Sequence, residues 1–320
     1  KSFPNFIYDL KFENFQNDPE NESKKLMQFC NLPWNKKCLE FYKRENLISK
    51  TASNIQIRQA IYKHSPDKYL PYKKLLNKFG LKDGDKFVCF AIRDKVYQLR
   101  IISSRFRDWT YHDYRNHDID NFVLAAEELA RRGYYVFRMG VVVEKPFNSS
   151  NPKIIDYANS NIRNDFMDVY LGAKCSFCIS TGSGFQDLPR LFSKPIALLE
   201  IPLGHLYIHH EKFLLLTKHH ILKKEKRKLS LSEIFSHGVA YANDTTIFEQ
   251  KGIALVDNTP EEIKDIVIEM VENLEFKKKL NPEDEELQKT FRSLYTSNIE
   301  RIKDHIAIKD NFHKYHNHKY

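Results

Sequence analysis

The chain has 320 residues, of which 42% are hydrophobic and 29% charged, as in an ordinary soluble globular protein. No apolar run approaches the roughly 18 residues of a membrane-spanning helix, and no signal peptide is found, so we expect no integral membrane segment. The formal net charge of +9 favours anionic ligands, but the lysines are dispersed and RNA-binding aromatic motifs are absent. We therefore expect no nucleic acid partner.

The five cysteines lack the spacing of a disulfide framework, which indicates a reducing compartment and a cytoplasmic protein. Cys175 and Cys178 form a CxxC pair inside an apolar segment, and no second pair exists. We interpret them as buried core residues because a redox or zinc site would place them at a turn or helix start. The chain contains no HExxH motif, and we interpret the terminal HKYHNHKY as a solvated tail, so we expect no metal site.

Residues 1–80 are predicted to be mostly helical, with one strand at the apolar stretch Phe6–Leu10. Asp18 and Pro19 predict the start of a helix, because Asp is a common N-cap and Pro suits the first helical position. A second short helix is predicted at Lys37–Tyr42. The chain begins without Met, in what resembles the middle of a strand, and we expect it to be a fragment or a processed product.

From residue 86 the sequence alternates apolar strands with helical patterns. Strands are predicted at Phe87–Ile92, Tyr134–Met139, Cys175–Ile179, Ile196–Ile201 and Ile253–Val256. Helices are predicted at Ile119–Arg132, Pro152–Ala158, Asp165–Leu171, Gln186–Phe192, Leu231–Ser236 and Thr259–Asn273. Continuous apolar strands separated by helices indicate one parallel sheet covered on both faces, so the predicted fold class is α/β, with a Rossmann-like sheet. The predicted domains are residues 1–80, a Rossmann-like domain at 81–275, and a helical, basic tail at 276–320.

Polar residues follow these strands at the edge where α/β sheets bind ligands. Arg93 and Asp94 follow the first strand, Arg138 ends the second, and Glu144 and Lys145 come shortly after it. A single Arg at a strand end is usually structural and pairs with a carboxylate. Two of them beside a glycine turn favour phosphate, which matches the planar fork of guanidinium donors. We expect Arg93, Arg138 and the glycine turn to share one crevice.

That turn, Ser180-Thr181-Gly182-Ser183-Gly184, lies between the third strand and a helical run. Strand, glycine turn and helix is the layout in which backbone N–H groups face an anion, although glycines also occur at such turns only to fit the bend. We predict that the following residues bind a donor phosphate: Arg93, Arg138, Lys145, Ser180, Thr181, Gly182, Ser183 and Gly184.

Two resemblances refine these expectations. The segment IYDLKFENFQNDPENESKKLMQFCNLPWNKKCLEFY, followed by TASNIQIRQAIY, resembles the C-terminal part of bacterial sulfotransferases over about residues 5–76. Asn31 and Ala60 depart from the Gly and Pro of that family. The resemblance implies a tail that packs beside a sulfonate-donor site, with Ser53 and Arg58 as relics of that site. The family's phosphosulfate-binding loop lies upstream of this tail and is absent here, so we do not expect a complete sulfotransferase.

Residues 84–272 resemble a family of bacterial glycosyltransferases similar to the donor-binding half of two-Rossmann (GT-B) enzymes. The resemblance rests on AIRD at Arg93, HDYR at 112–115, FRMG at Arg138 and STGSGF from Ser180. Ala91 stands where relatives often have His. The resemblance implies a metal-independent transferase without a cofactor, which moves a sugar from a nucleotide sugar to a surface-glycan type of acceptor.

The residues leave the catalytic base open among Asp94, Asp113, His112 and Glu144, and Asp113 is equally a turn former before a helix. The acceptor domain that normally precedes a GT-B donor domain is missing, so we expect an incomplete or fused enzyme. The alternatives are a sulfotransferase-linked module and a non-catalytic nucleotide-binding or scaffold domain.

Overall fold

The computed structural model describes residues 7–43, 60–61, 70–102, 110–201, 203, 213–276 and 281–302. The chain divides into two compact units, Lys1–Leu75 and Leu76–Tyr320. The domain boundaries expected from the sequence stay predictions. Within the described residues, no helix combines the length and apolar character needed to cross a membrane.

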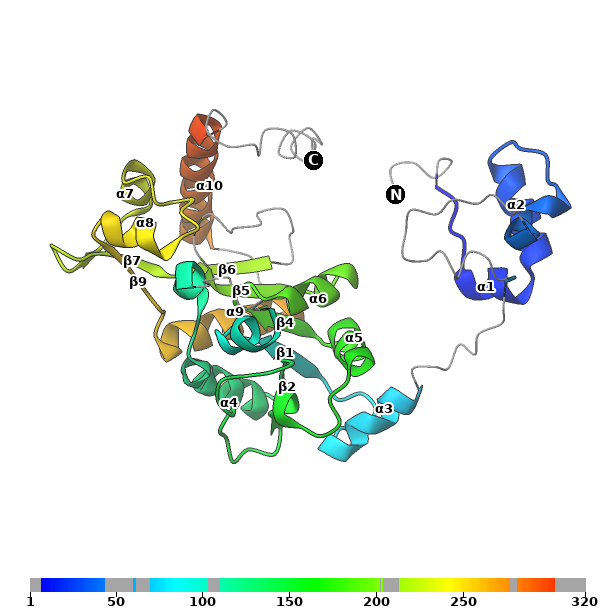
Figure 1. Ribbon diagram of the computed structural model, residues 1–320, viewed down its shortest axis with the longest axis horizontal. Coiled ribbons are helices and arrows are strands. Elements are labelled where there is room, and N and C mark those ends of the chain that lie inside the picture. Colours follow the sequence, from blue (N-terminus) through cyan, green and yellow to red (C-terminus); the bar gives the residue numbers. More distant parts are fainter. Residues whose placement is uncertain are drawn as a thin grey trace. The chain divides into compact units, whose positions relative to one another are not determined.

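The first unit is helical where it is described (Figure 1). It contains α1 (Phe12–Asn17), α2 (Pro19–Phe29) and 3₁₀ helices at Lys36–Cys38 and Phe41–Lys43. Asp18 caps α2 by accepting a hydrogen bond from the Asn21 N–H at 3.2 Å, which confirms the predicted helix start. Residues 7–10 form no strand, so that part of the strand prediction is wrong. The described part of this unit offers no second strand with which the stretch could pair.

The second unit is built on a six-stranded parallel sheet in the order β3-β2-β1-β4-β5-β6, which confirms the predicted α/β fold class (Figure 1). Its strands are β1 (Phe87–Ala91), β2 (Tyr135–Arg138), β3 (Ile154–Ile155), β4 (Phe177–Ser180), β5 (Ile196–Ile201) and β6 (Phe213–Thr217). This is the strand order of a doubly wound Rossmann sheet, in which ligands bind where the order reverses. Here the reversal lies between β1 and β4.

Helices cover both faces of this sheet. On one face α4 (Val123–Arg131) and α9 (Pro260–Phe276) pack over a core that includes Val88 and Phe90. On the other side of the sheet lie α5 (Asp165–Lys174) and α6 (Asp187–Leu191) (Figure 1). Alternate strand residues point to opposite faces, so the fully buried strands read as continuous apolar runs in the sequence.

A second, three-stranded sheet is antiparallel, in the order β8-β7-β9. It consists of β7 (His219–Leu222), β8 (Arg227–Lys228) and β9 (Ile253–Val256). The expectation that Ile253–Val256 belongs to the parallel sheet is therefore wrong. A short apolar strand carries no information about its partner, and here the partner is a hairpin strand, β7, that the sequence did not reveal.

Some remaining elements match the predictions and others do not. Leu231–Ser236 forms α7 as predicted, and Pro152–Ala158 forms no helix because it contains β3 and a 3₁₀ turn at Tyr157–Asn159. Cys175 and Cys178 are buried free thiols, which confirms the core interpretation of the CxxC pair. The other elements are α3 (Leu70–Leu76), α8 (Thr245–Gln250), α10 (Pro282–Ile302), the π-helical turn Gln98–Ile102, and 3₁₀ helices at Asn77–Phe79, Thr110–Arg115, Ile119–Phe122 and Gly184–Gln186.

Leu129 tests whether the α4 side of the sheet forms the main core. Its side chain is fully buried within the core cluster, and Leu129→Ala should lower the free energy of unfolding by about 2–5 kcal/mol. Leu124→Ala is the matched control on the same helix, because Leu124 is 38% exposed and its loss should change stability by about 0.5 kcal/mol or less. Equilibrium denaturant unfolding measures both, and equal effects would contradict this description of the core.

Candidate functional site

Two cavities open where the loop after β1 leaves the sheet. The first, here called the glycine-turn cavity, has a volume of about 510 Å³ and is lined in part by Arg93, Arg115, Gly182, Phe185 and Leu188. The second, here called the ion-pair cavity, has a volume of about 480 Å³ and is lined in part by Asp113, His117, Arg138, Glu144 and Lys145. Ile92 and Asp94 line both cavities. The glycine-turn cavity lies at the reversal in strand order, because Arg93 follows β1 and the turn follows β4.

Hydroxyl groups hold the Ser180–Gly184 turn in place. The Ser180 hydroxyl donates a hydrogen bond to Gln186 Oε1 at 2.9 Å and accepts one from the Ser183 N–H at 3.3 Å. Thr181 Oγ1 accepts a hydrogen bond from the Arg93 N–H at 2.9 Å. Ser180 and Thr181 are buried, so their side chains shape the turn and fix the loop after β1, whereas Ser183 and Gly184 are more exposed.

Gly182 has a φ of +78°, in the left-handed region that favours glycine. Its carbonyl oxygen accepts a hydrogen bond from Arg115 Nη2 at 2.8 Å. A Cβ atom at this position would lie 3.5 Å from the same nitrogen. That distance is an ordinary van der Waals contact, so the positive φ is the reason for glycine at this position.

Sequence reasoning missed Arg115 as a site residue. It belongs to the HDYR motif but precedes the turn by 67 residues, and it reaches the cavity from the end of the 3₁₀ helix Thr110–Arg115. The HDYR motif alone does not show which of its residues, Arg115, His112 or Asp113, lies at the glycine-turn cavity. A backbone hydrogen bond from the His117 N–H to the Arg93 carbonyl oxygen, at 3.1 Å, holds the Arg115 segment beside the loop after β1.

Arg93 is the least compensated charge among the described residues of this cavity. Both terminal nitrogens of its guanidinium are buried and have no hydrogen-bond partner in the described part of the chain. Burial and the positive charge of Arg115 together lower the pKa of Arg93 to about 10, against the opposing charges of Asp113 and Asp94. The side chain still carries its charge at neutral pH. A desolvated cation beside a second cation is costly, and an anion placed between the two would remove that cost.

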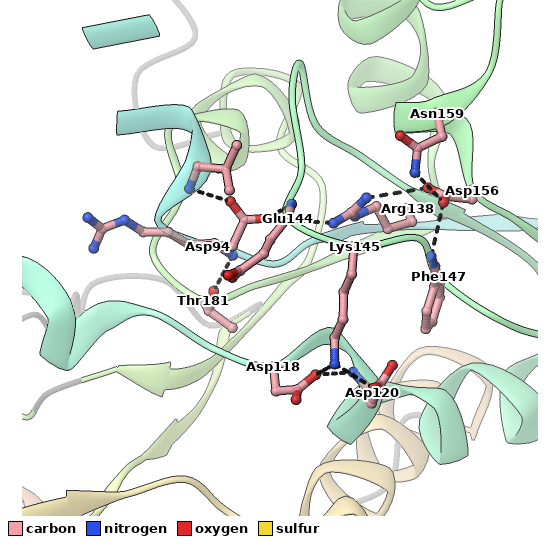
Figure 2. Close-up of polar contacts among 12 residues, drawn as sticks. Asp94, Asp118, Asp120, Arg138, Glu144, Lys145, Phe147, Asp156, Asn159 and Thr181 are labelled. Atoms are coloured by element: carbon pink, nitrogen blue, oxygen red, sulfur yellow. Dashed lines mark hydrogen bonds and ion pairs between the residues drawn. The ribbon is translucent and has the colours of Figure 1, made fainter. Parts of the chain in front are cut away.

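Arg138 takes a different position from the one expected. Its side chain is 1% exposed and forms ion pairs with Asp94 at 3.7 Å and Asp156 at 3.4 Å (Figure 2). Burial lowers the pKa of Arg138, and the two carboxylates oppose that shift. Arg93 and Gly182 share the glycine-turn cavity, whereas Arg138 lines the ion-pair cavity. Its contacts are those of a buried structural cation.

Asp94 has little capacity left to act as a base. One carboxylate oxygen accepts a hydrogen bond from the Val96 N–H and the other from the Glu144 N–H, both at 2.9 Å. The second oxygen also faces Arg138. Asp94 therefore ties the loop after β1 to the loop that follows β2, as Figure 2 shows.

The other predicted residues lie away from the turn. Lys145 pairs with both Asp118 and Asp120, so two carboxylates already neutralise its charge (Figure 2). Glu144 is exposed at the rim of the ion-pair cavity and pairs with Lys95 at 3.1 Å.

The remaining two candidates for the base belong to the HDYR motif. The Asp113 carboxylate accepts a hydrogen bond from Asn116 Nδ2 at 2.9 Å, which fits the turn-forming alternative. The His112 ring lies 3.9 Å from that of Tyr111, and His112 does not line either of the two cavities. Ser53 and Arg58 lie outside the described residues.

The sequence did not reveal a cluster at the carboxyl edge of β5 and β6, in which His117, Glu200 and Lys218 are buried and Asp257 is half-buried. Lys218 Nζ lies 2.6 Å from Asp257 Oδ1, and His117 Nδ1 lies 3.7 Å from the same oxygen. Burial raises the pKa of Glu200 to about 7, helped by the negative charge of Asp257. Burial lowers the pKa of His117 to about 4. The four residues come from four separate segments of the chain, so no local sequence motif predicts the cluster.

Comparisons with known proteins add little. No protein-family model matches the chain. A protein of Aquifex aeolicus (strain VF5), described only as an uncharacterized protein, is 41% identical over 76 residues, which are 24% of this chain and 10% of that protein. The chain thus spans about a tenth of the length of this relative.

Among solved structures, the glycosyl transferase family 9 protein from Veillonella parvula DSM 2008 is similar over 67% of this chain and 52% of that chain. The sequence identity is 14% and the TM-score 0.35, and a likeness at that level establishes neither a shared fold nor a shared activity. None of the comparisons supports the sulfotransferase-like segment.

The buried Glu200 carboxyl predicts a pH dependence of stability. Its folded pKa of about 7 lies above the ordinary value of 4.5, so the folded state binds the extra proton between these values and loses stability as pH rises through them. The free energy of unfolding of Glu200→Gln, relative to that of the wild type, should therefore increase by up to about 3 kcal/mol as pH rises from 4.5 to 7. Denaturant unfolding in the presence of EDTA measures the difference.

Comparing the two proteins at each pH cancels the opposite contribution of His117, whose lowered pKa makes stability rise over an overlapping range. A difference that stays constant between pH 4.5 and 7 would contradict the prediction.

Proposed function

We propose that the second unit binds the diphosphate of a nucleotide sugar in the glycine-turn cavity and transfers the sugar to a glycan acceptor. The proposal rests on the Arg93 guanidinium beside Arg115 and the Gly182 turn. Its terminal nitrogens are buried and have no hydrogen-bond partner among the residues that the structure describes. The proposed glycan acceptor rests on the resemblance to bacterial glycosyltransferases, whereas the proposed nucleotide ligand rests on the charges and lining of the cavity.

The charges at the cavity suit a diphosphate. Burial lowers the pKa of Arg93, and repulsion between Arg93 and Arg115 adds to that shift. A diphosphate carries enough negative charge to engage both guanidinium groups, and their planar forks match its oxygens. Because Gly182 has no side chain, its backbone is open to close approach by the ligand.

The remaining lining suits a nucleoside. Apolar side chains of Tyr97, Val141, Phe185 and Leu188 border the cavity, and Tyr97 and Val141 are 39% and 48% exposed, respectively. A volume of about 510 Å³ falls within the usual range of roughly 300–1,000 Å³ for small-molecule sites. The cationic part of the cavity suits the diphosphate of a nucleoside diphosphate, and the apolar part suits its nucleoside.

The reaction would use these parts as follows. An acceptor oxygen bonds to the anomeric carbon, and the bond from that carbon to the outer phosphate oxygen breaks. Negative charge develops on the departing diphosphate, where Arg93 and Arg115 stabilise it. The acceptor proton needs a base, and we add Asp168 to the candidates. It lines the cavity, and burial raises its pKa. One carboxylate oxygen pairs with Arg163 at 2.7 Å, and the other is buried without a hydrogen-bond partner among the described residues.

Arg93→Met is the sharpest test, because it keeps much of the side-chain stem and removes the charge. Charge-assisted hydrogen bonds to phosphate contribute about 1.5–3 kcal/mol, so the dissociation constant of a nucleoside diphosphate should rise about 10- to 100-fold. Isothermal titration calorimetry with uridine, guanosine, adenosine and cytidine diphosphates measures it. The matched control is Arg131→Met, since Arg131 is 70% exposed on α4 and lines neither cavity.

The proposal fails if the wild type binds none of the four diphosphates at millimolar concentration, or if Arg93→Met binds them as tightly as Arg131→Met does. Release of nucleoside diphosphate from nucleotide sugars in the presence of glycan acceptors then tests transfer separately from binding.

A further inference from the structure

The buried cluster beside the ion-pair cavity has the composition of a metal site. The ligand atoms of His117, Glu200 and Asp257 lie within 4.8 Å of one another. The three residues come from the segment after the 3₁₀ helix Thr110–Arg115, from β5, and from the residue directly after β9. We propose that His117, Glu200 and Asp257 bind a divalent transition-metal ion of the zinc type.

The first argument is that the cluster contains buried polar atoms without partners. Both ring nitrogens of His117 and Oε2 of Glu200 are buried and make no hydrogen bond within the described residues. His117 is 8% exposed and Glu200 is 1% exposed. Leaving such groups unpaired costs roughly 1–3 kcal/mol each, more when they are charged. An ion that accepts lone pairs from the imidazole and the carboxylate removes this cost.

The second argument is the backbone of Glu200. It has a φ of +59° inside a strand, a conformation that is costly for a residue with a side chain. The pairing of β5 with β6 shifts register between Leu199 and Ile201, so Glu200 occupies a β-bulge. Bulges re-aim side chains at functional sites. The other oxygen of Glu200 accepts a hydrogen bond from the Asn258 N–H at 2.8 Å, which holds the carboxylate beside the loop that carries Asp257.

Lys218 does not already fill the role of the cation. Its ammonium pairs with Asp257 and lies 3.4 Å from the Asn116 carbonyl oxygen. Among the described residues, these contacts leave His117 Nε2 and Glu200 Oε2 without a hydrogen-bond partner, and His117 Nδ1 has only Asp257 Oδ1 at 3.7 Å. Lys218 balances one of the two carboxylates, and the second carboxylate remains available with the neutral imidazole.

The donor set indicates the class of ion. One imidazole nitrogen and two carboxylate oxygens form a three-ligand set that suits zinc and related ions and leaves a coordination position for water. His117 lines the ion-pair cavity, which gives the ion an entry path. The backbone N–H of His117 donates to the Arg93 carbonyl oxygen at 3.1 Å, so an ion here would also fix the loop that carries Arg93.

Calorimetric titration of Zn²⁺ into EDTA-treated full-length protein tests the proposal. The background carries His313→Ala, His316→Ala and His318→Ala, because the histidine-rich end could bind zinc by itself. In this background Glu200→Gln should weaken one equivalent of binding by about a hundredfold or more, since loss of an outer-shell residue alone costs about 10- to 100-fold. The matched control is His219→Gln, because His219 pairs with Glu262 at 2.9 Å outside the cluster.

Thermal unfolding provides a second readout. Zn²⁺ should raise the melting temperature of the background protein and of the His219→Gln variant, but not that of the Glu200→Gln variant. If Glu200→Gln does not fold, Asp257→Asn takes its place. Equal zinc binding by the Glu200→Gln variant and the background, or no zinc-dependent stabilisation of either, would overturn the proposal and leave Lys218 as the resident cation. Neither outcome depends on nucleotide binding.

Discussion

The arrangement of the site depends on the carboxylate of Asp94. It accepts backbone hydrogen bonds from the loop after β1 and from the loop after β2, and it faces the buried guanidinium of Arg138. Arg138 is held from its other side by Asp156. Because this ion pair is desolvated, removing one partner would leave an unpaired buried charge. Asp94 and Arg138 therefore fix each other, with Asp94 lining both cavities and Arg138 lining the ion-pair cavity alone.

That division assigns different roles to two arginines that the sequence presents as equivalent. Arg138 pairs with the carboxylates of Asp94 and Asp156, and these pairs stabilise the fold. The Arg93 backbone N–H donates to Thr181, but within the described residues both terminal nitrogens of its guanidinium lack hydrogen-bond partners. A protein keeps an uncompensated buried charge only at a cost to its stability, which the binding of an anion recovers. The reversal of strand order between β1 and β4 is where such sheets bind ligands, so topology and charge indicate the same place.

Part of this could be predicted from the sequence. Long apolar strands and regular helical patterns predicted the parallel sheet. The positions of Arg93 and the glycine turn directly after strand ends predicted that they share one crevice. Strand pairing could not be predicted for β9, since a four-residue apolar strand fits either sheet. Contacts between residues that are distant in the sequence could not be predicted either. Arg115 meets Gly182 across 67 residues, and Glu200 reads as an ordinary strand residue until its φ is known.

The central claim is that an anionic ligand completes the pair of guanidinium groups at the glycine turn. The most direct measurement is a crystal structure of the protein with the nucleoside diphosphate that it binds most tightly. The account predicts that the diphosphate lies in the glycine-turn cavity, with its oxygens on the Arg93 and Arg115 guanidinium groups and beside Gly182. A diphosphate bound in the ion-pair cavity on Lys145, with the terminal nitrogens of Arg93 still without partners, would contradict it.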